Sequence, residues 1–504
     1  MKIKVKHVLL FLFQFILLIE IITSYVVANI GNEVYEEEKQ KIKDIAMMLE
    51  QTAGAGDYKM VKRSKWPDDG YIFNKELSSC KNGSKIIWDE DKKAIKYTGR
   101  LTDECTIYFD IFSPSNISEV CNTGDNLTNC IVSLGNKGSN DITKIYHHDS
   151  SLTNGASDNS YRYAGGDYQV TDKAISAGLN NITTNDATST NGIINLYCNG
   201  TKQNIEYKCS SSSDIYYTLQ YDTSNTHFST YNNALEKATA DGYLTKDNIK
   251  NYVCFGSNTT TCPTGCLYRI IGVIDGKIKL IEADYAWGYS DINRFFIGDD
   301  GDYSYTIKMA NTVSISIYRG KMDSLSLYYW NKATSINTWS ESLLNKTNLN
   351  INFINNIGTT WSNKIATTTW KVGGGPFANI RNVVPATAYQ YEVGNSASTT
   401  TYDAKIGLMY ISDYGFAANP NFWSIGLDSY SETKDINWMH MGLNEWTITR
   451  ESSTSNTVIF IENTGNLQTG FVTNDYFVRP VFFLDSSITY VSGDGTQSSP
   501  IRIN

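Results

Sequence analysis

The chain has 504 residues, of which 19% are charged, and its 43 basic and 52 acidic side chains give a formal net charge of −9. Phosphate binding depends on clustered Lys and Arg, so this balance argues against nucleic acid as a partner. The length predicts about two to four domains, because single cores stop growing at roughly 250–300 residues.

Tyrosine is the unusual component, with 34 residues in the chain, about twice the frequency of an ordinary soluble protein. A composition rich in Tyr and side-chain amides and poor in charge is typical of binding surfaces, since Tyr offers a large amphipathic contact area with few rotatable bonds. AT-rich coding DNA also enriches Asn, Ile and Tyr. Composition alone therefore leaves both explanations open.

The sequence predicts that residues 1–28 are a signal peptide or a membrane anchor. Three lysines precede the apolar run Val8–Ile19, which matches the basic and hydrophobic regions of an export signal. Small residues before position 29 favour cleavage after Ala28. We therefore expect an extracellular or cell-surface protein that contacts the membrane through this segment.

The stretch Phe15–Ile22 also resembles the start of a type IV prepilin. In that family a glutamate near the start of the helix can pair with the terminal amine of a neighbouring subunit, and Glu20 is the candidate in this chain. Gln14 stands where a prepilin peptidase requires glycine, and Glu20 lies one residue late. Filament assembly is therefore an alternative to simple secretion or anchoring.

Residues 29–56 are predicted to be a helical stalk. Within Glu33–Gln51, acidic residues near the start suit the helix dipole, and Ile42, Ile45, Met48 and Leu49 share one helical face.

Residues 57–113 are predicted to be a small β domain. Short runs rich in Ile, Tyr and Phe are broken by turn residues, which indicates two or three antiparallel strands. We expect a disulfide between Cys80 and Cys105 to staple them.

Residues 114–250 are rich in Asn, Ser and Thr and contain few large apolar side chains outside Ile193–Leu196 and Ile215–Leu219. Such a composition buries little surface. We therefore expect a loose connector with some strands.

The chain has nine cysteines, and in an exported protein cysteines indicate disulfides before metal ligands. Neighbours in sequence suggest the further pairs Cys121–Cys130 and Cys198–Cys209. The odd thiol then belongs to the cluster Cys254, Cys262 and Cys266. A zinc site is the alternative for this cluster, but no histidine lies nearby to complete the four ligands that structural zinc requires.

Residues 251–504 are predicted to form the main domain, since eight of the ten tryptophans lie between Trp287 and Trp446. Asp275-Gly276 between two β-rich runs predicts a hairpin over 267–281. Apolar spacing predicts two helices, over 335–349 and 353–361. The remaining predicted strands are Ile406–Ser412, Trp446–Thr449, Val458–Ile461, Val478–Leu484 and a last short strand within Tyr490–Asn504. Because Pro480 lies within Val478–Leu484, that strand should begin at Pro480 or lie at the edge of a sheet.

This half of the chain contains a set of short motifs: Asn251–Gly256, Cys262-Pro263, Leu267–Val273, Lys405–Gly415, Asn437–Met439, Glu445–Arg450, Val478–Leu484 and Ser498–Ile503. These motifs resemble those of a family of exported proteins of low-GC gut bacteria, which often have prepilin-like amino termini. The resemblance covers about half the chain and implies a C-type-lectin-like fold related to formylglycine-generating enzyme, and so an α+β protein overall. Some proteins of that fold are targets of diversity-generating retroelements, which change residues near the carboxy terminus.

The resemblance also assigns residues. It implies a Cys254–Cys262 disulfide, with Cys266 as the odd thiol, and a scaffold that includes Trp438, Trp446, Arg450 and Arg479. Ordinary solvated loops are the alternative explanation for the residues between these scaffold positions. The implied variable, ligand-binding residues are His440, Asn444, Glu451, Ser453, Asn456, Glu462, Asn463, Asn466, Gln468, Thr469, Asn474, Asp475 and Tyr476.

Cofactor motifs give little support for bound groups. Asp299, Asp300 and Asp302 around Gly301 could supply hard oxygen ligands to calcium, but their spacing is not that of a helix–loop–helix site. An acidic turn is the favoured interpretation, and we expect no cofactor.

An enzyme is not expected. The paired late cysteines of formylglycine-generating enzyme are missing, because no cysteine follows Cys266. His440 is the only histidine after His227, and a lone histidine is more often a packing or loop residue than a catalyst.

The sequence therefore favours a surface adhesin or receptor that binds a host or bacterial cell-surface protein or glycan. A minor pilin-like filament subunit is the alternative.

Overall fold

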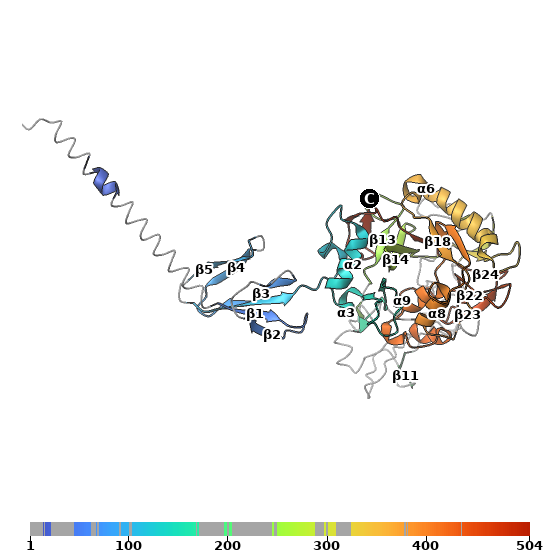
Figure 1. The fold of residues 1–504 in the computed structure, drawn as a ribbon, viewed down its shortest axis with the longest axis horizontal. Helices are drawn as coiled ribbons and strands as arrows, with labels where there is room; N and C mark the ends of the chain where they lie inside the picture. The colour runs from blue at the N-terminus through green and yellow to red at the C-terminus, as the bar shows by residue number, and fades with distance from the viewer. Residues whose placement is uncertain are drawn as a thin grey trace, which may run out of the picture. The chain divides into compact units, whose positions relative to one another are not determined.

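The computed structural model describes most of the chain, in separate stretches. These residues divide into two compact units, 1–113 and 114–504, and Figure 1 shows the elements of each. The described residues are 14, 16–21, 45–61, 67, 70–89, 92–99, 103–167, 169–170, 196–198, 201–203, 244–245, 249–287, 297–298, 301–308, 324–376, 380, 382–434 and 436–504.

Near the amino terminus, Gln14 and residues 16–21 are helical. Within the part of the chain that the structure describes, no helix has the length and apolar composition needed to cross a membrane.

The predicted helical stalk is wrong at its carboxy-terminal end. Residues 45–50 form strand β1 (Ile45–Glu50), and residues 51–57 form a turn and loop. In a strand, Met47 faces the small core at 5% exposure, whereas the helical interpretation needed Met48 and Leu49 on one buried face. Strand pairing with distant residues outweighs the local helical spacing. Residues 29–44 lie outside the described residues.

The first unit is built on one mixed sheet of order β2-β1-β6-β3, in which β1 and β6 are parallel. A separate hairpin, β4–β5, packs Trp88 against Phe109, with ring centroids 5.1 Å apart. The predicted β domain is thus present, with more strands than expected and with β1 added from the supposed stalk. The strands after β1 are β2 (Tyr58–Val61), β3 (Tyr71–Cys80), β4 (Lys85–Asp89), β5 (Ala94–Thr98) and β6 (Cys105–Ile111).

A nine-stranded sheet organises the second unit, with the order β20-β25-β15-β14-β13-β27-β26, while β7 and β8 join it through β14. Strands β13 and β14 run through this unit with helix α2 alongside (Figure 1). The sheet comprises β7 (Ile145–His147), β8 (Tyr161–Tyr163), β13 (Tyr252–Cys254), β14 (Leu267–Ile274), β15 (Lys277–Glu282), β20 (Ile406–Gly407), β25 (Val481–Phe483), β26 (Tyr490–Ser492) and β27 (Ile501–Ile503).

The first part of the predicted connector is wrong, because residues 114–167 belong to the core of the second unit. Helix α2 (Leu127–Lys137) begins at Asn126, whose side chain accepts a hydrogen bond from the amide of Asn129, and it buries Leu127, Ile131 and Leu134. These three residues follow helical spacing, so a short apolar face suffices despite the polar composition. This unit therefore begins near residue 114 rather than 251.

The predicted hairpin is confirmed as β14 and β15. Asp275 and Gly276 have φ angles of 50° and 69°, as a two-residue turn of the primed type requires.

The two predicted helices are present with altered bounds. A π-helix, η5 (Leu344–Phe353), continues into α6 (Ile354–Ser362). The predicted strand over 406–412 is wrong beyond Gly407, because α9 (Ile411–Ala417) begins shortly after it. The other helices of this unit are η2 (Ile117–Glu119), α3 (Asn140–Thr143), η4 (Trp339–Glu341), α8 (Pro385–Glu392), η6 (Pro420–Phe422) and η7 (Leu427–Thr433).

Smaller sheets complete the unit. One has the order β21-β22-β23, another β16-β17-β24, and the pairs are β18–β19, β9–β12 and β10–β11. Their strands are β9 (Gln169–Val170), β10 (Leu196–Cys198), β11 (Thr201–Gln203), β12 (Leu244–Thr245), β16 (Tyr303–Lys308), β17 (Ser324–Tyr329), β18 (Thr368–Lys371), β19 (Thr401–Ala404), β21 (Glu445–Arg450), β22 (Thr457–Ile461), β23 (Leu467–Phe471) and β24 (Asp475–Tyr476).

Candidate binding site

The predicted ligand-binding residues gather around the antiparallel sheet β21-β22-β23 and the adjoining strand β24 (Figure 1). Strand β22 is the central one and has the sequence TVIFI. Its β-branched and aromatic residues favour a strand packed on both faces, and Val458, Ile459 and Phe460 are all buried. This sheet gives the loops at its ends a rigid base.

Three aromatic rings form a cluster against this sheet. Tyr476 lies 4.5 Å from Trp446 and 4.4 Å from Phe460 between ring centroids. Gly470 leaves room for them, since a Cβ there would lie 3.0 Å from atoms of both Trp446 and Tyr476. The Trp446 Nε1–H donates a hydrogen bond of 2.9 Å to the carbonyl of Tyr328. The cluster is therefore fixed by packing and by a buried hydrogen bond.

His440 is not part of an exposed face, contrary to the prediction. Its side chain is 1% exposed, and its Nδ1 lies 3.5 Å from the hydroxyl of Tyr414. The residue follows the buried turn that contains Asn437 and packs within the core, where it cannot meet a large ligand.

Glu451 is also buried, at 2% exposure, so it does not lie on an exposed face as the prediction requires. Its carboxylate accepts hydrogen bonds from the Ser453 amide at 3.0 Å and the Thr457 hydroxyl at 3.2 Å. A buried carboxylate needs such donors, and these tie together the turn between β21 and β22. Glu451 therefore holds the turn in place.

Several of the other predicted side chains accept hydrogen bonds from neighbouring segments. Asn444 accepts from the Asn463 amide at 2.8 Å, and Asn466 accepts from the Ser431 amide at 2.6 Å. Asp475 accepts from the Ser304 hydroxyl at 3.0 Å.

Two more of these contacts are local. Glu462 accepts from the Thr464 hydroxyl at 2.9 Å, and Asn474 donates to the Tyr476 hydroxyl at 3.1 Å. These contacts tie the side chains to other parts of the protein.

Three predicted side chains remain open to a ligand. Among the described residues, the side chains of Asn456, Asn463 and Thr469 make no hydrogen bond, and both asparagines are exposed. Asn456 precedes β22 and lies next to the carboxy-terminal end of β23, where the amide of Val472 donates to the backbone carbonyl of Asn456 at 3.0 Å. Asn463 lies in the turn at the opposite end of β23. Thr469 stands between them, so the three groups follow one edge strand over roughly 17 Å.

Phe471 completes this edge and was not predicted. It pairs with Thr457 beside Asn456, and 57% of its surface is exposed. Phe471 lies four residues after Leu467 in β23, and side chains alternate between the two faces of a strand. Phe471 is therefore on the same face as Thr469 and the buried Leu467. That pattern predicts burial, and the sequence carries no signal for the exposure. Ser453 and Gln468, exposed and half-buried, lie near the two ends.

We call this set, Asn456, Asn463, Thr469 and Phe471, the β23 edge. Amide groups donate and accept hydrogen bonds, and an exposed ring supplies an apolar contact at little entropic cost. Such an edge can bind a neutral, hydrogen-bonding surface.

The predicted calcium residues do not form a site among the described residues. Asp302 is 1% exposed, and its carboxylate accepts from the backbone amides of Lys332 at 3.1 Å and Leu343 at 3.2 Å. Burial raises the pKa of this carboxyl. Asp299 and Asp300 lie outside the described residues.

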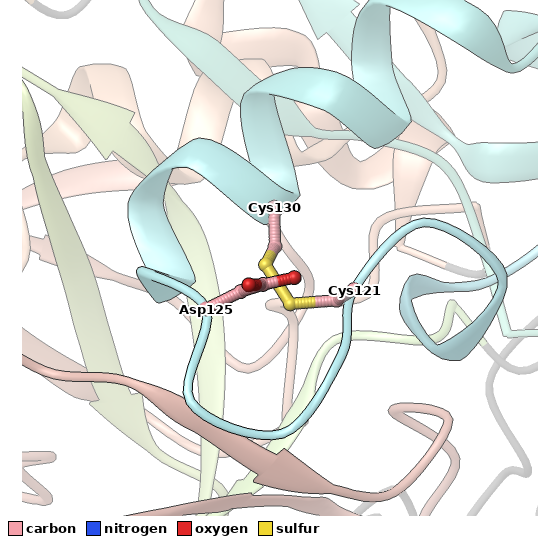
Figure 2. A group of neighbouring side chains, drawn as sticks. All are labelled: Cys121, Asp125 and Cys130. Carbon is pink, nitrogen blue, oxygen red and sulfur yellow. A yellow bond between two sulfur atoms is a disulfide. The ribbon is translucent and has the colours of Figure 1, made fainter.

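Another group of possible metal ligands, Cys121, Asp125 and Cys130, lies at the start of α2 (Figure 2). Figure 2 shows the two sulfur atoms joined in a disulfide, which confirms the predicted pair. Bonded sulfurs are not thiolate ligands, and Asp125 accepts from the amide of Asn122 at 2.8 Å. The group is therefore a structural staple.

The other disulfides agree with expectation where both cysteines are described. Cys80–Cys105 and Cys254–Cys262 are formed, and Cys266 is a buried free thiol. Burial, together with nearby Glu282, raises the pKa of Cys266 to about 11, so it stays protonated. The Cys198–Cys209 pair includes a residue outside the described set.

Comparison with known proteins adds no assignment to this geometry. The chain matches no protein-family model, no curated protein and no solved structure.

Proposed function

We propose that this protein is an extracellular surface binding protein, an adhesin or receptor, and that its ligand contacts the β23 edge. The supporting observation is that Asn456, Asn463 and Thr469 keep open hydrogen-bonding groups near the exposed ring of Phe471, along a strand that packs against the aromatic cluster at Gly470. Most neighbouring polar side chains are used within the protein, so these are the groups left for a partner. A cell-surface protein or glycan is the proposed ligand.

The test is binding of the purified full-length protein to arrays of glycans and cell-surface proteins. A Phe471→Ser variant, alone and with Asn456→Ala, is expected to lose binding at least tenfold, because each removes an open contact. Ile351→Ser is the matched control, since Ile351 lies on η5 and is 51% exposed. Equal binding by the wild type and both β23-edge variants would refute the site.

We also propose a C-type-lectin-like fold for the second unit, with sequence variation limited to its displayed residues. The two ends of the predicted 251–504 domain lie in one sheet, because β13 pairs in parallel with β27, and this closed arrangement supports the proposal. Burial of His440 and Glu451 removes them from the proposed variable set. Genomic DNA tests the variation directly: a template repeat beside a reverse transcriptase gene should carry adenines at codons such as 456 and 463, and their absence would oppose it.

A pilin-like filament subunit is the second candidate function. The described helical residues near the amino terminus include Leu18 and Ile21, which are 55% and 58% exposed. Apolar side chains at such exposure favour burial in a membrane or against other subunits. Mass spectrometry of the mature terminus separates the two functions: a terminus at residue 29 supports a cleaved signal peptide, and a terminus at Phe15 supports prepilin processing.

A further inference from the structure

A buried carboxylate links three elements of the second unit. Glu392, the last residue of α8, is 1% exposed. Its Oε1 accepts from the Ile411 amide at 2.9 Å, and its Oε2 accepts from the Ser412 amide at 3.0 Å. The hydroxyl of Thr449, on β21, contacts Oε1 as well. One side chain thus holds the end of α8, the start of α9 and strand β21 together.

Glu392 is buried without a cation partner of its own. Lys279 and Arg162 are both buried and contact Asp413, at 2.5 Å and 3.3 Å, and Arg162 also contacts the partly exposed Asp158 at 2.8 Å. No cation of the described residues lies within salt-bridge distance of Glu392. Ionisation of this carboxyl group therefore places a charge in the buried interior with only neutral donors in contact with it, which costs free energy.

Glu392 is the carboxylate of this group best placed to be protonated. Asp413 and Asp158 each have a cation partner, whereas Glu392 has only neutral donors. Burial raises the pKa of Glu392 to about 7, with nearby Asp413 adding to the shift and Ser412 and Thr449 opposing it.

The remaining titratable neighbours change this balance little near neutral pH. Burial raises the pKa values of Tyr410 and Tyr389, so both stay neutral. The Lys371 Nζ donates to the carbonyl of Val393 at 2.5 Å. Burial, and to a lesser extent the charge of Arg162, lowers the pKa of His148, so this side chain is neutral near pH 7.

We propose that Glu392 is a proton-dependent joint, which fastens β21 to α8 and α9 when protonated and loosens this attachment when it ionises. The Thr449 hydroxyl and the Ser412 amide donate to this carboxylate and favour its ionised form, but burial and the nearby charge of Asp413 oppose them and favour the protonated form. Ionisation releases the proton to solvent and leaves an uncompensated negative charge beside Asp413. Strand β21 leads directly into the turn at Glu451, so the effect reaches one end of the β23 edge.

The direction of the pH effect follows from the raised pKa. Below pH 4.5 both folded and unfolded chains hold the proton. As pH rises, the unfolded chain ionises first while the folded chain keeps its proton, so stability falls until pH passes about 7 and then levels off. His148 acts in the opposite sense, because its lowered pKa makes stability fall as pH drops below 6.5. A variant that removes only Glu392's charge is needed to separate the two effects.

Glu392→Gln is that variant. The glutamine can donate to Thr449 and accept from the Ser412 amide, and the Ile411 amide keeps the Thr449 hydroxyl as an acceptor at 3.3 Å. Between pH 5 and pH 8, the unfolding equilibrium constant of the wild-type protein should rise about 10- to 100-fold relative to that of the variant. Hydrogen exchange at residues 411–412 and 447–450, corrected for intrinsic rates, should accelerate with pH in the wild type only.

Glu341→Gln is the matched control, since Glu341 is exposed on η4, and it should follow the wild-type pH profile. A wild-type profile identical to that of Glu392→Gln would overturn the proposal. Should Glu392→Gln not fold, Thr449→Val provides a second test. Because the Thr449 hydroxyl stabilises the ionised form, its loss should move the midpoint to higher pH, and an unmoved or lowered midpoint would also overturn the proposal. Neither measurement requires the ligand, so the outcome is independent of the proposed function.

Discussion

The two units of this protein stabilise their folds in different ways. Among its described residues, the first buries Met47, Ile107 and Phe109 as a small core cluster beside the Cys80–Cys105 disulfide, and its ion pairs reach the surface. The second buries a large aromatic core together with the ion pairs Arg479–Glu445 and Lys279–Asp413. The first unit should therefore depend on its covalent link, and the second on its large core and its buried ion pairs.

The largest expected effect breaks a buried ion pair of the second unit. Arg479 binds Glu445 through two hydrogen bonds, of 2.7 and 3.0 Å, and both residues are 1% exposed. Arg479→Met should cost about 3–5 kcal/mol in the free energy of unfolding, because Glu445 is left buried without a cation. Urea unfolding followed by tryptophan fluorescence measures this loss.

The double variant Arg479→Met with Glu445→Leu is the control. Because a well-packed apolar pair can replace a buried ion pair, most of the loss should be recovered. A single variant as stable as the wild type would show that this unit does not depend on the Arg479–Glu445 ion pair, and the contrast between the units would fail.

The next effect concerns the first unit and its disulfide, which joins residues 25 positions apart. Replacing Cys80 and Cys105 by Ser should cost roughly 3 kcal/mol, which is a large share of the stability of so small a core. Hydrogen exchange should show loss of protection in β6 while β14 stays protected.

Replacing Cys254 and Cys262 by Ser is the matched control in the second unit, where the bridge spans only 8 positions. This change should leave β14 folded, because the extensive core remains. Equal unfolding of both units after removal of their own disulfides would contradict the proposed difference.

A smaller effect tests packing beneath the β23 edge. Gly470→Ala should destabilise the protein by about 1–3 kcal/mol, since its methyl group would lie 3.0 Å from atoms of both Trp446 and Tyr476, which is closer than ordinary van der Waals contact. Thermal unfolding measures the change. Thr469→Ala, on the same strand but half-buried, should change stability by less than about 0.5 kcal/mol, and equal losses would show that the aromatic cluster is not tightly packed.

Local elements of this fold could be predicted from the sequence, and long-range ones could not. The β14–β15 hairpin depends on its own residues, with Asp275-Gly276 setting the turn. Helix α2 was missed although Asn126, Leu127, Ile131 and Leu134 carry its capping and apolar spacing. The parallel pairing of β1 with β6 joins residues some 60 positions apart, as with Ile45 and Cys105, and no local pattern indicates it.

The candidate site was predictable as a region but not residue by residue. Asn456 and Asn463 are displayed, as expected of polar residues in turns. Burial of His440 and Glu451 depends on Tyr414 and Thr457, whose positions are set only by the packed fold. The exposure of Phe471 likewise depends on where the packed core ends along β23, since Leu467 on the same face of this strand is buried, and sequence alternation alone does not reveal that limit.

The smallest expected effect comes from removing a surface ion pair of the first unit. Lys81 lies 2.5 Å from Glu104, yet both side chains are more than 60% exposed. Water screens such a pair, and ordering two long side chains opposes the attraction. Lys81→Ala should therefore leave the thermal unfolding of this unit unchanged within measurement error at about 0.15 M salt. A clear loss of stability would mean that the first unit also depends on its ion pairs, and the difference between the units would then rest on the disulfide alone.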